Sequence, residues 1–294
     1  MDGILNIDKP RGRTSFSIVA VIRRLSGEKR VGHAGTLDPD ATGVLPVCLG
    51  QGTRVTEFLV DTTKAYRAVA ELGAATDTCD AGGRVTFRGD YTGIGREQLE
   101  AALEAFRGDI RQTPPMYSAV KHQGRPLYAL ARAGITVARK SRPAKIYRLE
   151  VLAWEPPLVT IEVECGKGTY IRSLADDLGQ ALGCGAHLKS LVRTRCGVFG
   201  IGDAVDVPRL EEAFRHGYWT QFIYPIDIVL RHYPAAVVDS AAEEVIKNGG
   251  KVTLEETGEP AADRCRAYSR DGRFIAVLRR APGEELWRPK KVFA

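Results

Sequence analysis

The segment from Gly32 to Pro46 constrains the fold of this chain most, because it contains three glycines and two prolines in fifteen residues. Glycine allows backbone angles that other residues avoid and proline fixes one angle, so the segment predicts a rigid loop that something approaches closely. Asp38 and Pro39 have two interpretations here. Aspartate followed by proline is typical of a helix start, whereas a closely approached loop also suits a functional carboxylate, and composition alone does not decide.

A chain of 294 residues favours two domains, since domains average roughly 100 to 200 residues. Hydrophobic residues make up 44% and charged residues 27%, which are ordinary values for a folded globular protein. Because the expected helices and strands do not alternate regularly, we predict an α+β fold rather than a doubly wound sheet. Apolar spacing and turn signals place these helices between Thr14 or Ser15 and Gly27 and over 97–106 and 170–182, and the strands over 66–73, 147–154 and 158–165.

The chain has a different pattern after Leu230. Ser240 with Glu243 predicts a capping box that opens a short helix, which stops near Asn248. Asp271-Gly272 lies between two apolar runs and predicts a β-hairpin. We therefore expect a large domain over 1–230 and a small β-rich domain over 231–294.

The net charge of +6 is concentrated in one segment. Between Asp109 and Glu150 there is no acidic residue and there are nine basic ones, without which the acidic residues of the chain would outnumber the basic ones. A solvated cationic face is one explanation. Aromatic rings interleaved with the charges favour the other, a groove for a nucleic-acid backbone with stacking partners. These rings belong to Tyr117, His122, Tyr128 and Tyr147.

Other patterns argue against several kinds of site. Six scattered cysteines without a C-x-x-C pair and five histidines without H-x-x-H make a zinc site or a disulfide framework a poor interpretation. Gly166-Lys167-Gly168-Thr169 does not complete a phosphate-binding loop, because the earlier glycine that this motif requires is missing. We find no secretory signal and no run near the roughly 18 apolar residues of a membrane span, so we expect a cytoplasmic protein.

Five motifs follow one another along roughly residues 3–200. In chain order they are Asp8-Lys9-Pro10-x-Gly12-x-Thr14-Ser15; Gly32-His33-x-Gly35-x-Leu37-Asp38-Pro39-x-Ala41-Thr42-Gly43-x-Leu45-Pro46; Lys64-x-Tyr66 with Leu72-Gly73 and Thr76-Asp77-Thr78-x-Asp80; Lys167-Gly168-Thr169-Tyr170-Ile171-Arg172-Ser173-Leu174; and Leu191-x-Arg193-Thr194-x-x-Gly197. Together they closely resemble the tRNA pseudouridine synthase B family, which modifies the T loop of tRNA. The end of the chain resembles the small PUA-like RNA-binding domain of bacterial members more loosely.

The resemblance implies a pseudouridine synthase fold with a mixed, largely antiparallel sheet, and isomerisation of the T-loop uridine conventionally numbered 55. That reaction breaks the N1–C1′ bond and joins C5 to C1′ without redox change or group transfer, so no cofactor is expected. It requires a base flipped out of its stack and a carboxylate placed against the sugar or the ring. The resemblance implies that Asp38 is this carboxylate, that Tyr66 stacks on the flipped uracil and that Arg172 pairs with Asp38.

Further residues take supporting roles by the same resemblance. Asp80 joins the charge network of Asp38, His33 reaches into the space opened in the T loop, and Tyr170 lines the pocket. Four cations are expected to position other groups or to contact phosphate, namely Lys9, Lys64, Lys167 and Arg193. The basic insertion, about residues 110–149, closes over the RNA in the family. Its expected backbone contacts are Lys121, Arg125, Arg132, Arg139, Lys140, Arg142 and Lys145.

The expected partner is the T arm of tRNA, with no membrane, no required protein partner, no metal and a monomeric enzyme. One rival function is an RNA-binding or RNA-folding protein without catalysis, against which Asp38, Tyr66 and Arg172 together argue. A second rival is a metal-dependent nuclease, which activity in excess chelator would exclude. Its candidate ligands are Asp38, Asp40, Asp77 and Asp80.

Overall fold

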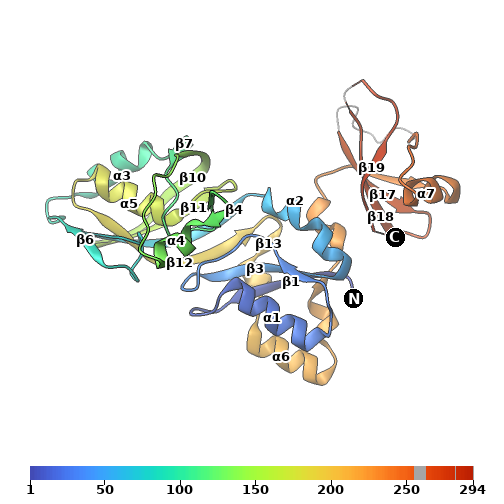
Figure 1. Cartoon of the computed structure of the whole chain (residues 1–294), viewed down its shortest axis with the longest axis horizontal. Coiled ribbons are helices and arrows are strands. Elements are labelled where there is room, and N and C mark those ends of the chain that lie inside the picture. Colours follow the sequence, from blue (N-terminus) through green and yellow to red (C-terminus); the bar gives the residue numbers. More distant parts are fainter. Residues whose placement is uncertain (255–262, 282, 294) are drawn as a thin grey trace.

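The structure, a computed structural model, describes residues 1–254, 263–281 and 283–293. Figure 1 shows a broad sheet flanked by helices and, beyond it, a small sheet near the C-terminus. The α+β prediction is confirmed, and the sheet is mixed and largely antiparallel, as the resemblance implied. None of the helices within the described ranges is long and apolar enough to cross a membrane.

The large sheet has 11 strands. Its main path runs β14 (Val205–Asp206), β1 (Gly3–Lys9), β3 (Thr42–Leu49), β12 (Ala186–Cys196), β4 (Lys64–Leu72), β11 (Leu158–Cys165), β10 (Arg142–Glu155) and β7 (Gly108–Gln112). Three short strands pair at its sides, β2 (Val31–His33), β13 (Phe199–Gly200) and β15 (Ile223–Tyr224). Two separate hairpins are β5 (Ala74–Thr76) with β6 (Val85–Arg88), and β8 (Lys121–His122) with β9 (Arg125–Pro126).

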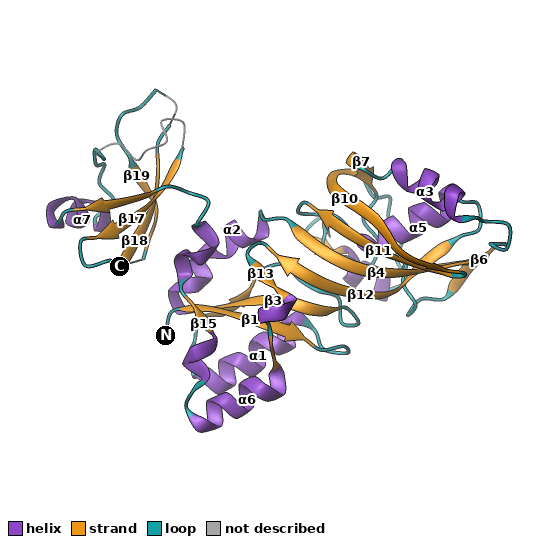
Figure 2. Cartoon of the chain, turned by 180° about the vertical axis from the view of Figure 1, so that it is seen from behind, coloured by secondary structure: helices purple, strands orange, loops and turns teal. Residues whose placement is uncertain are grey.

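Helices cover this sheet in two groups, seen from opposite sides in Figures 1 and 2. The helices are α1 (Ser15–Ser26), α2 (Thr56–Val60), α3 (Arg96–Glu104), α4 (Leu127–Arg132), α5 (Ile171–Ala181) and α6 (Val207–His216). Apolar side chains of α1 and α6 share one core with β1 and β3, while those of α3 and α5 share another with β4, β10 and β11. Short 3-10 helices are η1 (Gly50–Val55), η2 (Ile201–Asp203), η3 (Trp219–Phe222) and η4 (Ile226–Leu230).

Local signals explain where helix α1 begins and ends. The Thr14 side chain accepts a 3.0 Å hydrogen bond from the Ser17 backbone N–H, which satisfies a donor that the helix leaves free. Gly27 ends the helix with a φ of 66°, a left-handed conformation that glycine adopts without steric penalty. The predicted boundaries of this helix are confirmed.

The Asp38-Pro39 pair does not start a helix. The Ala41 N–H donates to the Asp38 carbonyl at 3.1 Å, so the chain makes a tight turn and enters β3 at Thr42. The pairing of β3 with β12 requires this path, because Thr42 and Gly43 lie opposite Val192 and Arg193 of that neighbouring strand. The turn leaves the Asp38 side chain free for another role.

The C-terminal sheet contains the predicted hairpin. Its order is β16 (Ala235–Val238), β17 (Arg264–Ser269), β18 (Phe274–Arg279) and β19 (Arg288–Val292), with helix α7 (Ser240–Lys247) beside it. The prediction of Ser240 as the cap of that helix is wrong. Asp239 is the cap, and its carboxylate accepts from the Ala242 N–H at 2.8 Å, because an aspartate one residue earlier brings both an acceptor and a negative charge to the helix start.

Apolar packing, a hydrogen bond and ion pairs join the C-terminal sheet to the large domain. Val277 is buried in one cluster with Phe58 of α2, and Tyr268 donates a hydrogen bond to Asp227. Lys290 and Lys291 lie 3.6 and 3.1 Å from the carboxylate of Glu57. The division at residue 230 stays a prediction, because these contacts make the small sheet part of the packing around α2.

We predict that Gly43→Ala destabilises the protein far more than Gly12→Ala. Both glycines have positive φ, so each alanine costs about 1–2 kcal/mol in backbone strain. At Gly43 the added methyl group would also overlap the Arg193 carbonyl, adding about 1–3 kcal/mol, whereas the space beside Gly12 is open. Urea unfolding of both variants tests this prediction, and equal losses would contradict it.

Candidate active site

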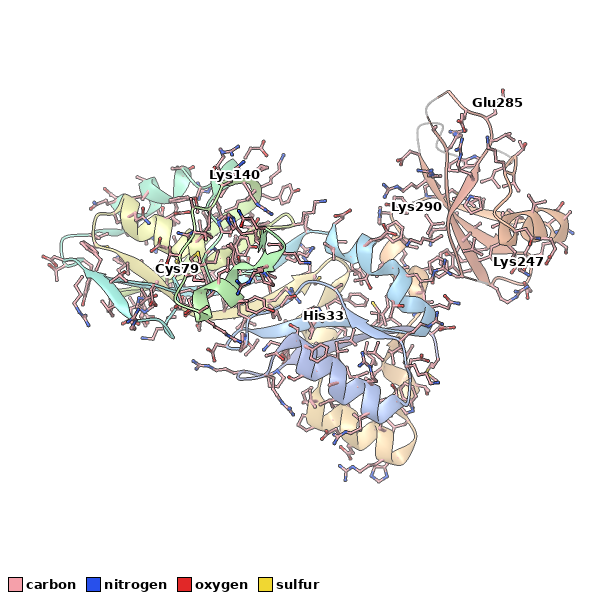
Figure 3. The ribbon with its side chains drawn as sticks, in the orientation of Figure 1. His33, Cys79, Lys140, Lys247, Glu285 and Lys290 are labelled. Carbon is pink, nitrogen blue, oxygen red and sulfur yellow. The ribbon has the colours of Figure 1, made fainter. Side chains whose placement is uncertain are left out.

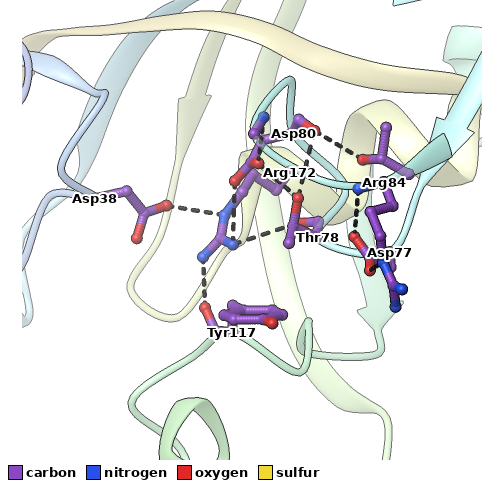
Figure 4. A network of polar contacts seen from close by, with 9 residues as sticks. Asp38, Asp77, Thr78, Asp80, Arg84, Tyr117 and Arg172 are labelled. Atoms are coloured by element: carbon purple, nitrogen blue, oxygen red, sulfur yellow. Dashed lines mark hydrogen bonds and ion pairs between the residues drawn. The ribbon is translucent and has the colours of Figure 1, made fainter. Parts of the chain in front are cut away.

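The guanidinium of Arg172 joins three segments that are distant in the chain (Figure 4). Its Nε lies 2.8 Å from Asp38 Oδ2, and one Nη lies 3.5 Å from Asp80 Oδ2. The other Nη donates to the Tyr117 carbonyl at 2.8 Å. Arg172 stands in the first turn of α5 and only 7% of its side-chain surface is exposed, so the ion pairs form in a region with little water.

Asp38 combines a partly buried setting with access to solvent. Loss of hydration raises the pKa of its carboxyl above the usual value, Arg172 opposes that rise, and the charge of Asp80 adds to it. Still, 45% of the Asp38 side-chain surface is exposed. The carboxylate is therefore held by a cation on one side and open to a ligand on the other.

Asp80 occupies a tight turn between β5 and β6. Its Oδ1 accepts hydrogen bonds from the Thr78 hydroxyl at 2.6 Å and from the Gly82 N–H at 3.1 Å. Cys79 in this turn has a φ of 60°, which is unusual for a residue with a side chain. The turn is held against β12, because Cys79 O accepts from the Leu188 N–H at 3.0 Å.

A cavity of about 260 Å3 opens beside Asp38 and Arg172. Tyr66 of β4 and Tyr170, at the start of α5, line it, and its size suits one small ring system. Tyr66 also packs against the core of the large domain, and burial raises the pKa of its hydroxyl to about 12. This hydroxyl is therefore protonated at neutral pH.

Three of the four predicted cations are buried, and their N–H groups donate hydrogen bonds to backbone carbonyls. Lys9 Nζ donates to the Pro10, Arg13 and Pro39 carbonyls at 3.0, 2.6 and 3.0 Å. Arg193 reaches the Val44 and Gly35 carbonyls at 2.6 and 2.9 Å, and so holds the loop around Asp38 from its other side.

Lys64 completes this set of buried cations. Its Nζ donates to the Leu59, Val60 and Thr62 carbonyls at 3.2, 2.6 and 2.6 Å, at the end of α2. The exposed fractions of Lys9, Lys64 and Arg193 are 0%, 6% and 1%, so these groups are placed for positioning and not for phosphate contact.

Of the remaining two predicted residues, Lys167 lies at the cavity of Asp38 and His33 lies away from it. Lys167 is exposed at the mouth of the cavity, 2.8 Å from Asp61, and remains open to a ligand. His33, labelled in Figure 3, ends strand β2 opposite Val47 and is not among the residues that line the cavity of Asp38. Burial lowers the pKa of His33, and the nearby charge of Arg193 lowers it further, so the ring is neutral at physiological pH.

The basic insertion displays its charges to solvent. All seven predicted backbone contacts are exposed, and Figure 3 shows Lys140 at the outer surface of this segment. Lys121, Lys140 and Arg142 gather with Arg139 around a second cavity of about 170 Å3. Arg139 also donates to the Pro114 carbonyl at 3.0 Å, and Lys145 lies 3.7 Å from Asp109.

Sequence reasoning missed three residues that build the site. The side-chain amide of Gln112 accepts from the Tyr170 N–H at 2.9 Å and donates to the Tyr170 carbonyl at 3.2 Å. The Ser15 hydroxyl exchanges hydrogen bonds with the backbone of Leu37 at 2.9 and 3.1 Å, and Ser118 lines the cavity. The turn signal Pro114-Pro115, just after Gln112, could have drawn attention to this stretch.

Three of the four aspartates proposed as nuclease ligands, Asp38, Asp40 and Asp80, line one small cavity, but all four lie close to arginine side chains. Asp38 and Asp80 share Arg172, whereas Asp77 lies 3.3 Å from Arg84 and Asp40 lies 3.4 Å from Arg11. Within residues 1–254, 263–281 and 283–293, no group of three or more His, Cys, Asp or Glu residues is arranged to hold a metal ion.

Comparisons with known proteins cover nearly the whole chain. Residues 23–171 match the N-terminal domain of the TruB family pseudouridylate synthases, and residues 172–231 match the tRNA pseudouridylate synthase B C-terminal domain. The chain is 46% identical over 293 residues to tRNA pseudouridine synthase B of Dehalococcoides mccartyi (strain CBDB1), covering 100% of this chain and 97% of that protein. It is 43% identical to the protein of the same name from Pseudomonas aeruginosa (strain UCBPP-PA14), covering 94% and 91%.

Two solved structures share the fold over 99% of this chain and 85% of theirs. One is the crystal structure of a Cbf5-Nop10-Gar1 complex, with a TM-score of 0.77 and 28% identity. The other is the structure of an H/ACA RNP bound to a substrate RNA containing 2′-deoxyuridine, with a TM-score of 0.74 and 26% identity. The similarity thus includes the C-terminal sheet as well as the large one.

We predict that Asp80→Asn lowers the pKa of Asp38. The negative charge of Asp80 disfavours a second charge beside it, so its removal favours the ionised form of Asp38. A carbon-detected NMR titration of the Asp38 carboxyl measures the shift. Asp77→Asn is the matched control, because Asp77 belongs to the same turn but pairs with Arg84. An unchanged or raised pKa in Asp80→Asn would show that the two carboxylates are not coupled in this way.

Proposed function

This chain belongs to the TruB family of pseudouridylate synthases, and from that premise we propose that it isomerises the uridine at position 55 in the T loop of tRNA. The chain is a tRNA pseudouridine synthase, an isomerase. The proposal concerns the finer points, which are the target nucleotide, the flipping of its base and the catalytic use of Asp38.

The observation that carries this proposal is the Asp38–Arg172 ion pair at the side of a cavity lined by an aromatic ring. An uncompensated carboxylate in a partly buried position would tend to take up a proton and lose its reactivity. Arg172 favours the ionised form and leaves part of the carboxylate accessible. A nucleoside in the cavity would meet a charged, oriented Asp38.

The isomerisation conserves atoms and electrons. The N1–C1′ bond breaks, the detached uracil turns, C5 bonds to C1′, and the proton that C5 loses is balanced by one gained at N1. Asp38 contributes by attack on C1′, by attack on C6 or by removal of a proton. Each route requires the ionised carboxylate within reach of the nucleoside, and none requires a redox cofactor.

Tyr66 and Tyr170 would receive the extruded base. Stacking of a base on an aromatic ring contributes about 1–3 kcal/mol to binding, which helps to offset the loss of stacking within the RNA. The protonated Tyr66 hydroxyl would act as a hydrogen-bond donor, because burial holds its pKa at about 12. Water is kept from the reacting atoms by a cavity that closes around the base.

The insertion would supply the electrostatic attraction to tRNA. Exposed cations favour binding to a phosphate backbone, and four of the seven lie around one cavity. Arg172 also ties the base of the insertion to the site, through the Tyr117 carbonyl. Binding by the insertion and chemistry at Asp38 therefore involve neighbouring parts of one surface. The small C-terminal sheet is proposed to be the PUA-like RNA-binding domain.

We predict that Asp38→Asn abolishes pseudouridine formation while its affinity for tRNA stays within about tenfold, or about 1.4 kcal/mol. Asparagine keeps the shape of the side chain but removes the charge. Single-turnover assays with an unmodified tRNA transcript in excess chelator, followed by chemical mapping of pseudouridine, measure this effect. Asp40→Asn, an exposed neighbour, serves as the control. Near-normal turnover by Asp38→Asn would remove Asp38 from the chemistry, and activity lost in chelator would favour a metal-dependent reaction.

We predict that changing Lys121, Lys140 and Arg142 together to alanine weakens tRNA binding and flattens its salt dependence. Each lost phosphate contact should reduce the slope of log affinity against log salt by about 0.7 to 0.9. The control is a triple variant of exposed cations on α1 and α6, changing Arg24, Arg209 and Arg215. Equal slopes in wild type and the insertion variant would mean that the insertion is merely a solvated face.

A further inference from the structure

Ser118 carries a buried hydroxyl without a hydrogen-bond partner in the part of the chain that the structure describes. The residue is only 5% exposed, and it lines the same cavity as Asp38 and Tyr66. Buried polar groups in folded proteins are nearly always paired, because an unpaired one loses its bonds to water and gains none in return. An exception at a ligand cavity points to a partner that arrives with the ligand.

The backbone on both sides of the Ser118 side chain is held by hydrogen bonds to other segments. The Tyr117 carbonyl just before it accepts from Arg172 at 2.8 Å, and the Ser118 carbonyl accepts from the Tyr128 N–H at 3.0 Å. The start of the segment is also tied down, because the Ser173 hydroxyl donates to the Thr113 carbonyl at 2.9 Å. Arg172 thus sets the position of Asp38 and of the segment that carries Ser118.

The Thr169 hydroxyl at the cavity is less suited to such a role. The Thr169 hydroxyl already donates to the Gly166 carbonyl at 3.1 Å. Asn6 Oδ1 and His33 Nδ1 are likewise buried without a partner among the described residues, but neither residue lines this cavity. Among the described residues, Ser118 therefore combines a buried, unpaired hydroxyl with a place in the wall of the cavity where the proposed chemistry occurs.

We propose that Ser118 Oγ forms a hydrogen bond with an oxygen of the target nucleoside, either a uracil carbonyl or a ribose hydroxyl. A serine hydroxyl donates to the first and can donate to or accept from the second. This role rests on the proposed function, since it assigns a recognition contact within the same cavity. Because Ser118 belongs to the insertion, the contact links occupancy of the cavity to the position of the RNA-binding segment.

The test is Ser118→Ala in the full chain. Removing an unpaired hydroxyl should leave the melting temperature unchanged or higher, while losing one neutral hydrogen bond to the nucleoside should reduce kcat/KM about three- to tenfold. The control is Ser26→Ala at the end of α1, where the hydroxyl donates to the Ile22 carbonyl at 2.7 Å and accepts from the Glu28 N–H at 3.2 Å. That variant should melt earlier with its kcat/KM unchanged.

Substrates altered at one nucleotide identify the oxygen. If the loss caused by Ser118→Ala disappears on a transcript with 2′-deoxyuridine at the target, the bond is to the ribose, and if it disappears on a thiocarbonyl uridine, the bond is to the base. A loss of equal size on all these substrates would overturn the proposal. So would an unchanged kcat/KM, or a melting temperature that falls as in Ser26→Ala. Wild-type enzyme that makes no pseudouridine in the same assay would instead refute the proposed function.

Discussion

The Arg172 guanidinium is the contact on which the site depends. It brings together the loop of Asp38, the turn of Asp80 and the insertion at Tyr117, which are otherwise separate branches of the fold. Because the group is almost fully buried, removal of either acid would leave a charge without adequate compensation. The position of the Asp38 carboxylate therefore depends on a side chain at the start of α5, which the core of the large sheet positions.

Cations in this protein fall into two groups with different roles. Lys9, Lys64 and Arg193 are buried, and their N–H groups are taken up by backbone carbonyls around the cavity. Their hydrogen bonds keep rigid a set of loops that lack regular backbone pairing. The same hydrogen bonds offset part of the free energy lost when each charge leaves water. The cations of the insertion are exposed and make few internal contacts, so their charge is available to a polyanion.

Much of the architecture follows from short-range signals. The start and end of α1 depend on Thr14 and Gly27, and the C-terminal hairpin on Asp271-Gly272, because a cap or a turn involves residues only a few positions apart. The motif around Asp38 is equally legible, as it marks a rigid loop and, by resemblance, the family. The one-residue error at Asp239 shows the limit of such signals where two capping residues are adjacent.

Apolar spacing and turn signals were thus enough for the fold class and for several helices and strands, since each of these depends on local backbone chemistry. The expected role of Asp38 came from the family resemblance. Tertiary contacts decided the rest. Asp38 is in a turn and not at a helix start because β12 pairs with the chain that follows it. Lys9 and Arg193 are structural because carbonyls up to 158 residues away lie within reach of their N–H groups. Ser118 is unpaired for the same kind of reason: hydrogen-bond partners depend on which segments meet in space, and no local pattern encodes that meeting.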